Sequence, residues 1–289
     1  MMTRAWLILA DILVTLVLFI SLILFHFNPI SKTASPSTTK IDENLTLDQI
    51  PLPGIDLSAT LTLEDLVRMG QVCNKEPYMI ENKFLSRSLK EGLSELSAKI
   101  GDPIFIRIFK EESLLEVWIR TDTEYKHLKD YAICAFSGAL GPKLKEGDRQ
   151  APEGFYKVKK KHLNPNSKFH LSFNLGYPNA YDRAHGRTGS FLMVHGNCVS
   201  IGCYAMTDEK IEEIYELLEA ALASGQSYVQ VHAYPFRMTE QMMSLFSDNE
   251  WFDFWVNLKE GYDYFEAQKN PAHIEVKDKQ YMIHESHEL

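Results

Sequence analysis

The chain has 289 residues, of which 45% are hydrophobic, and its 30 basic and 39 acidic side chains give a formal charge of −9. This length allows one sizeable domain or two small ones, and the hydrophobic content excludes a wholly disordered chain. An acidic balance repels phosphate backbones, so we expect no nucleic-acid partner. The net negative charge lies in residues 207–289, which carry 17 acidic and 6 basic side chains.

The first 27 residues have the composition of a membrane segment. Residues 5–27 are apolar apart from four positions, one of which is Asp11. As a helix rising about 1.5 Å per residue they would reach about 34 Å, enough for the roughly 30 Å hydrocarbon core of a bilayer. No A-x-A-like cleavage site follows. We therefore expect residues 1–27 to be an uncleaved membrane anchor rather than a cleaved signal peptide, and the rest of the chain to be exported.

Two further segments precede the main domain. Residues 28–54 are rich in Ser, Thr and Pro and predict a linker. Residues 55–102 show two amphipathic patterns, one after a possible cap at Thr62 and one after a possible cap at Ser86. We expect a short helical lead-in there.

From residue 103 the hydrophobic pattern changes to a period of two, which is typical of strands. Residues 104–108 and 115–119 predict a β-hairpin, and a long helix should begin after Thr207 and end before Gly225. The other expected elements are strands at 131–136, 155–159, 191–195 and 228–233 and a helical region at 239–265. The sequence thus predicts an α+β domain from about residue 103 to residue 270, with C-terminal helices.

The residues best suited to chemistry lie between His195 and Cys203. A strand would deliver His195, and a Gly-rich loop would place Cys203 shortly before the N-terminus of the long helix. A helix N-terminus and an imidazolium both favour a thiolate, and Gly202 allows backbone amides to approach a substrate as an oxyanion hole. A buried structural cysteine beside a core histidine is the alternative reading of the same residues.

These residues resemble the YkuD-type L,D-transpeptidase catalytic domain, whose core is an H-G pair followed by [S/T]-x-G-C. His195-Gly196 and Ser200-Ile201-Gly202-Cys203 match this pattern. Further stretches are similar to the family or to its YafK-type subgroup, the peptidoglycan meso-diaminopimelic acid protein amidases: Leu140 to Lys143, Glu146 to Asp148, Pro152 to Tyr156, Asn179 to Gly186, and Tyr234 to Thr239.

The resemblance implies a fold and a set of roles. The resemblance covers residues 103–285, and the fold would be YkuD-like, with a mixed β-sheet core and the long helix following the catalytic cysteine. Cys203 would be the nucleophile and His195 the base, while Gly202, Ser200 and Gly196 would shape the oxyanion side of the pocket. The resemblance implies neither a cofactor nor a metal.

The sequence departs from the family pattern at two points. His195 precedes Cys203 by only eight residues, so the loop that caps the pocket is short, and Tyr204 stands where an [IV]-R pair usually begins. The arginine of that pair is a candidate contact for the substrate carboxylate. Arg183 is the candidate to replace it, with a structural ion pair as the alternative role, and we expect Tyr181 and His185 from the same stretch also to contact substrate.

A short capping loop bears on the reaction type. A transpeptidase must keep water from its thioester, whereas an open pocket favours hydrolysis. Together with the subgroup resemblance, this predicts an amidase or endopeptidase in the periplasm. Its partners would be peptidoglycan stem peptides and an outer-membrane lipoprotein attached through diaminopimelate. The runner-up is an L,D-transpeptidase that forms crosslinks or attaches the lipoprotein.

Two alternative functions belong to other classes of protein. A zinc-dependent wall hydrolase could use Asp182, His185, His195 and His232, although neither H-x-H nor H-E-x-x-H spacing is present. The second rival is a wall-binding module without catalysis. A thiol reagent should inactivate a cysteine enzyme and spare a zinc enzyme, and a chelator should do the reverse.

The remaining cysteines leave alternatives open. If Cys203 stays free, Cys73, Cys134 and Cys198 form an odd set. Cys198 could be a core residue, a partner of Cys134, or a resolving thiol for Cys203. The basic run at residues 157–161 predicts a solvated strand edge, with contact to anionic wall polymers as the alternative.

Overall fold

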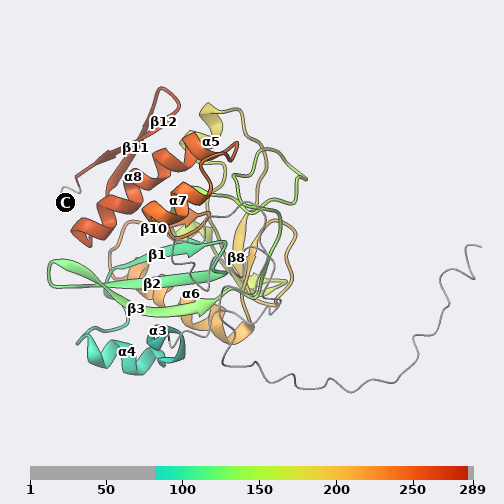
Figure 1. Cartoon of the computed structure of the whole chain (residues 1–289). Helices are drawn as coiled ribbons and strands as arrows, with labels where there is room; N and C mark the ends of the chain where they lie inside the picture. Colours follow the sequence, from blue (N-terminus) through green and yellow to red (C-terminus); the bar gives the residue numbers. More distant parts are fainter. Residues whose placement is uncertain (1–81, 286–289) are drawn as a thin grey trace, which may run out of the picture. The chain divides into compact units, whose positions relative to one another are not determined.

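The computed structural model describes residues 82–285, in which two five-stranded sheets and their covering helices form the fold (Figure 1). The expected anchor at 1–27, the linker at 28–54 and the helix after Thr62 lie outside the described residues. Among residues 82–285, no helix is long and apolar enough to cross a membrane.

The first sheet has the strand order β3-β2-β1-β10-β5. Its strands are β1 (Ile104–Phe109), β2 (Leu114–Thr121), β3 (Glu124–Ala132), β5 (Gly154–Val158) and β10 (Val229–Tyr234). The predicted hairpin is confirmed as the antiparallel pair β1–β2, and β1 pairs in parallel with β10. Strand β5 closes the other edge, antiparallel to β10.

The second sheet has the order β4-β9-β8-β7-β6, and a separate hairpin follows it in the chain. The strands are β4 (Ala135–Phe136), β6 (Leu163–Ser167), β7 (His170–Asn174), β8 (Met193–His195) and β9 (Tyr204–Ala205), and the hairpin is β11 (His273–Lys277) with β12 (Gln280–His284). Strands β8 and β9 run parallel and carry the candidate site.

Two of the helices, α6 and α8, are long, and the others are short. They are α3 (Lys83–Ser86), α4 (Leu89–Glu95), the 3-10 turn η2 (Lys160–His162), α5 (Ala180–Ala184), α6 (Asp208–Ala223), α7 (Glu240–Leu245) and α8 (Phe252–Gln268). The expected long helix is α6, which begins after Thr207 with two acidic residues in its first turn. The expected C-terminal helical region is α7 and α8, so the α+β class with C-terminal helices is confirmed.

Helices α6 and α8 account for the burial of both faces of the first sheet. Ile104, Ile106 and Ile108 of β1 lie in the core that α6 shares with both sheets. The alternate side chains of β1 face α8, where Phe105 packs with Phe265. Strand β1 is therefore buried at every position, although its sequence alternates.

Some expected boundaries are wrong, and two of them change the assignment of an element. Residues 131–136 do not form one strand: β3 ends at Ala132, and β4 begins at Ala135 in the other sheet. The second lead-in helix is capped by Ser88 rather than Ser86, because the Ser88 side chain accepts from the amide of Glu91 while the Glu91 carboxylate accepts from the amide of Ser88. That helix, α4, packs against β3.

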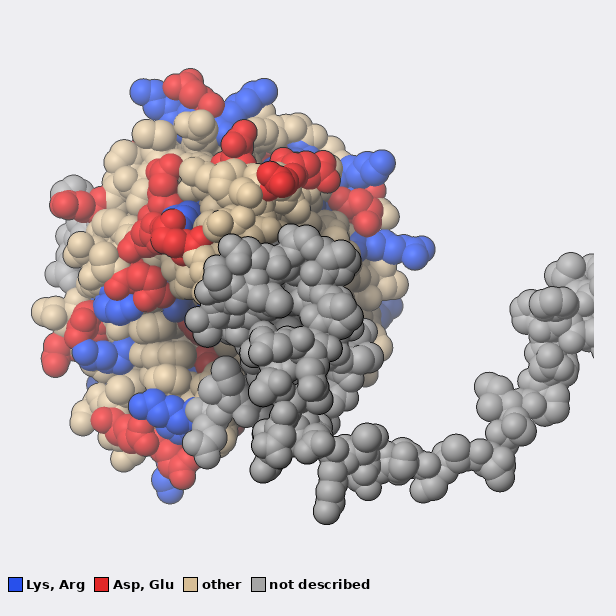
Figure 2. Space-filling model, viewed as in Figure 1, with Lys and Arg blue, Asp and Glu red and all other residues tan. Residues whose placement is uncertain are grey.

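The surface charge is mixed. On the face that Figure 2 shows, acidic and basic side chains lie interspersed on the described part of the molecule. Such a surface presents no broad basic stripe for a nucleic-acid backbone on this face, in keeping with the acidic composition.

Candidate active site

Strands β8 and β9 place the two predicted catalytic side chains on one face of the second sheet. Val194 pairs with Tyr204, and both are fully buried in the core. Since neighbouring residues of an extended chain point to opposite faces, we infer that His195 in β8 and Cys203, directly before β9, both point away from that core. The Met193 amide, one position before Val194, donates to Cys203 Sγ over 3.5 Å. The structure thus brings the predicted pair to the same face.

The surroundings of His195 determine which ring nitrogen carries the proton. Nδ1 lies 2.6 Å from the carbonyl oxygen of Gly196, which can only accept a hydrogen bond. Nδ1 therefore holds the proton, and Nε2 keeps a lone pair. The ring is 3% exposed and lies 4.7 Å from the ring of Phe169. This is the tautomer that a general base requires.

The Cys203 thiol has two close backbone neighbours. Besides the Met193 amide, Sγ lies 3.7 Å from the carbonyl oxygen of Phe191, to which the S–H group donates. A thiolate would have no proton to give to this carbonyl. The contact therefore favours the neutral thiol at rest.

Burial shifts both groups toward their neutral forms. It raises the pKa of the Cys203 thiol, with the Met193 amide and the Lys143 ammonium acting in the opposite direction. It lowers the pKa of His195, which the hydrogen bond to Gly196 only partly offsets. These directions are opposite to the thiolate and imidazolium expected from the sequence. Strand β9, which separates Cys203 from α6, also places the thiol outside the first turn of that helix.

The loop before Cys203 is held by Ser200. Its hydroxyl accepts from the Cys203 amide at 3.0 Å and donates to the Cys203 carbonyl at 2.7 Å. The Cys203 amide, a predicted oxyanion donor, is thus bonded to Ser200 in this structure. Gly202 has a φ of +113°, which L side chains rarely adopt, so a glycine is required there.

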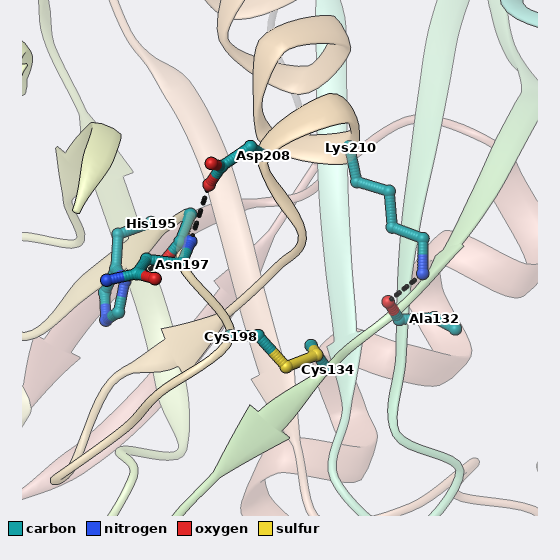
Figure 3. The surroundings of a disulfide bond; sticks show 8 residues. Ala132, Cys134, His195, Asn197, Cys198, Asp208 and Lys210 are labelled. Atoms are coloured by element: carbon teal, nitrogen blue, oxygen red, sulfur yellow. Dashed lines mark hydrogen bonds between the residues drawn. A yellow bond between two sulfur atoms is a disulfide. The ribbon is translucent and has the colours of Figure 1, made fainter.

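Gly196 is required for a different reason, which is space. A Cβ on Gly196 would lie 2.5 Å from Asp208 Oδ1 and 3.0 Å from the Phe169 carbonyl oxygen. Asp208, in the first turn of α6, accepts from the Asn197 amide at 2.7 Å (Figure 3). The start of α6 therefore fixes the chain just after His195.

A disulfide fixes the same loop from the other side. Cys134 and Cys198 are joined, with 5.3 Å between their Cα atoms, and the bond lies near the first turn of α6 (Figure 3). Among the three alternatives for Cys198, the structure shows the disulfide with Cys134. Cys198 is exposed and is therefore not a core residue. Cys203 remains a free thiol, and Cys73 lies outside the described residues.

The three predicted substrate contacts lie at the C-terminal hairpin. Tyr181 is buried and stacks on Tyr281 of β12 at 4.3 Å, and His185 Nε2 lies 2.9 Å from the Lys279 carbonyl oxygen. Arg183 is exposed and donates to the Pro178 carbonyl. It lines a pocket of about 340 Å³ between β5, α5 and β11–β12, not the strands that carry Cys203.

Lys143 is a further residue of the site, which the sequence alone does not predict. Its ammonium pairs with Asp148 at 2.5 Å and lies close enough to Cys203 to lower the pKa of that thiol. A Cβ on Gly189, two residues before Phe191, would lie 2.8 Å from Lys143 Cε. In the sequence, Leu140 to Lys143 is only part of a motif, because the position of Lys143 near Cys203 depends on the fold.

The residues of the zinc alternative do not converge. Within residues 82–285, the one group of three potential ligands whose atoms lie within 4.8 Å of one another is Glu116, His127 and Asp130. Glu116 already pairs with Arg107 at 2.7 Å and Arg237 at 2.6 Å. The guanidinium groups of Arg107 and Arg237 thus already neutralise the Glu116 carboxylate, which a metal ion would need as a ligand.

Comparisons with known proteins agree with the geometry. A family model described as YkuD, the L,D-transpeptidase catalytic domain, matches residues 103–231. "Putative L,D-transpeptidase YafK" from Escherichia coli K12 and its counterpart from strain O157:H7 are each 47% identical over 192 residues, covering 66% of this chain and 78% of the relative. The crystal structure of the helical cell shape determining protein Pgp2 from Campylobacter jejuni aligns with a TM-score of 0.37 and 18% identity, over 66% of this chain and 81% of Pgp2.

Proposed function

Because the chain belongs to the YkuD family of L,D-transpeptidase catalytic domains, in its YafK-type subgroup, we propose that residues 103–285 form a cysteine-dependent peptidoglycan amidase. Its substrate is the amide between diaminopimelate of a stem peptide and the side-chain amine of a C-terminal lysine on an attached outer-membrane lipoprotein. One observation carries the mechanism: the Gly196 carbonyl holds His195 with Nε2 unprotonated, on the face that also bears Cys203.

The reaction starts from a neutral pair. His195 Nε2 takes the thiol proton as Cys203 Sγ attacks the amide carbonyl carbon, and a tetrahedral intermediate forms. When this intermediate collapses, the C–N bond breaks, and the lysine amine leaves with the proton from His195. Water, deprotonated by the same nitrogen, then hydrolyses the thioester and regenerates the thiol.

Hydrolysis is favoured over transfer by the openness of the site. Only seven residues separate His195 from Cys203, and Asn197, Cys198 and Val199 in this short loop are exposed. A thioester formed there is reachable by water. The runner-up, an L,D-transpeptidase, would need an amine acceptor to reach the thioester before water.

The disulfide supports an exported location. Disulfides persist in oxidising compartments such as the bacterial periplasm and are rare in the cytosol. The Cys134–Cys198 bond therefore fits a periplasmic enzyme. We assign residues 1–27 as its membrane anchor and residues 28–54 as the linker to the catalytic domain.

Digestion of purified sacculi that carry covalently bound lipoprotein tests the proposal. Wild-type protein should release the lipoprotein and leave the muropeptide crosslinks unchanged, and Cys203→Ala should release none. New crosslinks between diaminopimelate residues would favour the transpeptidase. More than a few per cent of activity in Cys203→Ala would exclude the thiol mechanism.

A further inference from the structure

Exposed apolar side chains gather around the proposed catalytic pair. Within residues 82–285, the two most exposed large hydrophobic side chains are Ile201, at 80%, and Phe191, at 70%. Val199 is 53% exposed and Phe169 is 41% exposed. We call these four residues the apolar rim.

Each residue of the apolar rim contacts Cys203 or His195 or lies in the loop between them. Phe191 provides the carbonyl that accepts from Cys203 Sγ, and the Phe169 ring packs on His195. Val199 and Ile201 lie in the loop between His195 and Cys203. A substrate whose scissile bond reaches Cys203 therefore comes close to the residues of the apolar rim.

The backbone holds the apolar rim in place. Phe191 has a φ of +55°, a left-handed conformation that is uncommon for a bulky residue and persists only where the surroundings impose it. The loop with Val199 and Ile201 is fixed by the disulfide at Cys198 and by the hydrogen bonds of Ser200. The rim is thus presented to solvent before any ligand arrives.

We propose that the apolar rim binds the polypeptide on the leaving-group side of the scissile bond, through apolar side chains close to the attached lysine. The inference rests on the proposed function. A stem peptide built around diaminopimelate offers carboxylates, amines and methyl groups but no large apolar side chain, so a second stem peptide would leave the rim exposed. A polypeptide leaving group can cover it, and burying one Phe or Ile contributes about 1.5–3 kcal/mol.

Two synthetic substrates with the same scissile bond separate recognition from chemistry. In both, the diaminopimelate of a stem peptide is amide-linked to a lysine side chain. The first carries lysine alone, and the second carries a peptide of about ten residues that ends in this lysine and has an apolar residue beside it. Wild-type protein should show a KM about tenfold lower for the peptide-linked substrate.

Substitutions in the apolar rim should abolish this preference. In Phe191→Ser, Ile201→Ser and the double variant, the ratio of the two KM values should fall toward one. Leu245→Ser and Val256→Ser, also exposed apolar positions but on α7 and α8, are matched controls that should keep the ratio. The melting temperature and iodoacetamide labelling of Cys203 check that each variant is folded.

The outcomes distinguish the inference from the proposed function. Equal KM values in wild-type protein, or a ratio that survives the double variant, would overturn the apolar rim as a polypeptide site while leaving the amidase intact. Failure to cleave either substrate would overturn the amidase itself. A wild-type dimer that Ile201→Ser converts to a monomer with an unchanged KM ratio would assign the rim to contact between copies.

Discussion

At the residue scale, the catalytic pair is neutral before substrate binds. Burial raises the pKa of Cys203 and lowers that of His195, so protonated thiol and unprotonated imidazole coexist over a wide pH range. Because the folded pKa of His195 lies below its ordinary value, this base stays available in mildly acidic buffer. Activation then occurs during attack, when proton transfer to Nε2 accompanies formation of the C–S bond.

This state predicts how Cys203 reacts with iodoacetamide. Labelling should be slow at neutral pH and should accelerate only above the ordinary thiol pKa of about 8.5, because the thiolate is the reactive form. In His195→Gln, the pH profile of labelling should stay within about twofold, while turnover falls by about 10²–10⁴-fold. Mass-spectrometric mapping across pH measures the labelling. Fast, His195-dependent labelling at pH 6 would instead indicate a resting ion pair.

Two glycines offer a matched test of the loop geometry. Gly202 has a φ of +113° and Gly225 a φ of +112°, and neither has a neighbour that would collide with a Cβ. An alanine at either position should therefore cost a similar amount, about 1–3 kcal/mol of stability. Only Gly202→Ala should also lower kcat, by at least about tenfold, since Gly202 directly precedes the nucleophile. Thermal unfolding and steady-state kinetics compare the two, and equal kcat values would exclude a role for Gly202 in the site.

At the scale of elements, the disulfide and α6 hold the catalytic loop from two sides. Asn197 and Cys198 adopt left-handed conformations, with φ of 65° and 45°. The Asp208 carboxylate accepts a hydrogen bond from the Asn197 amide, and Cys198 forms a disulfide with Cys134. Because the loop is short, these two attachments restrict the position of Cys203, which directly precedes β9.

Removal of the disulfide should therefore affect both stability and activity. The double variant Cys134→Ala/Cys198→Ala should lose about 2–4 kcal/mol of stability. Its kcat should fall because the loop between His195 and Cys203 loses its covalent attachment. Wild-type protein treated with a reductant should behave in the same way, and the double variant should not respond to reductant. A lower melting temperature with unchanged kcat would restrict the disulfide to a stabilising role.

Some helices and strands can be predicted from their own sequences, whereas others depend on contacts with distant parts of the chain. The β1–β2 hairpin and α6 follow from local patterns, because their apolar periodicity and capping residues are contained within the segment. Strand β9 has only two residues, and it exists through pairing with β4 and β8. The same limit applies to the site: motif spacing predicts His195 and Cys203, whereas Lys143 and Phe169 reach them only through long-range packing.

At the scale of the whole molecule, buried charge joins the first sheet to α8. Arg107 of β1 pairs with Glu116 of β2 and with Glu266 of α8, each at 2.7 Å. Glu116 also accepts from Trp118 Nε1 at 2.8 Å. Because the charged side chains on this face of β1 and β2 are paired, α8 can cover them. The sheet can then be buried on both sides, which gives the second sheet and its catalytic strands a fixed support.

This network gives a pH-dependent prediction for Glu116. Its pKa is lowered from 4.5 to about 2, because the attraction of Arg107 and Arg237 outweighs the cost of burial. Since the folded pKa lies below the unfolded one, the stabilisation, about 3 kcal/mol from the shift, is present above pH 4.5 and is lost as pH falls toward 2. Glu116→Gln should cost about 3–5 kcal/mol at pH 7, because it leaves buried guanidinium charge uncompensated. Urea unfolding at pH 7 and pH 3 should show this cost shrinking in acid, whereas the exposed control Glu216→Gln should stay within about 0.5 kcal/mol of wild type at both pH values. A cost for Glu116→Gln that is independent of pH would mean that shape, rather than charge, accounts for the contribution of Glu116.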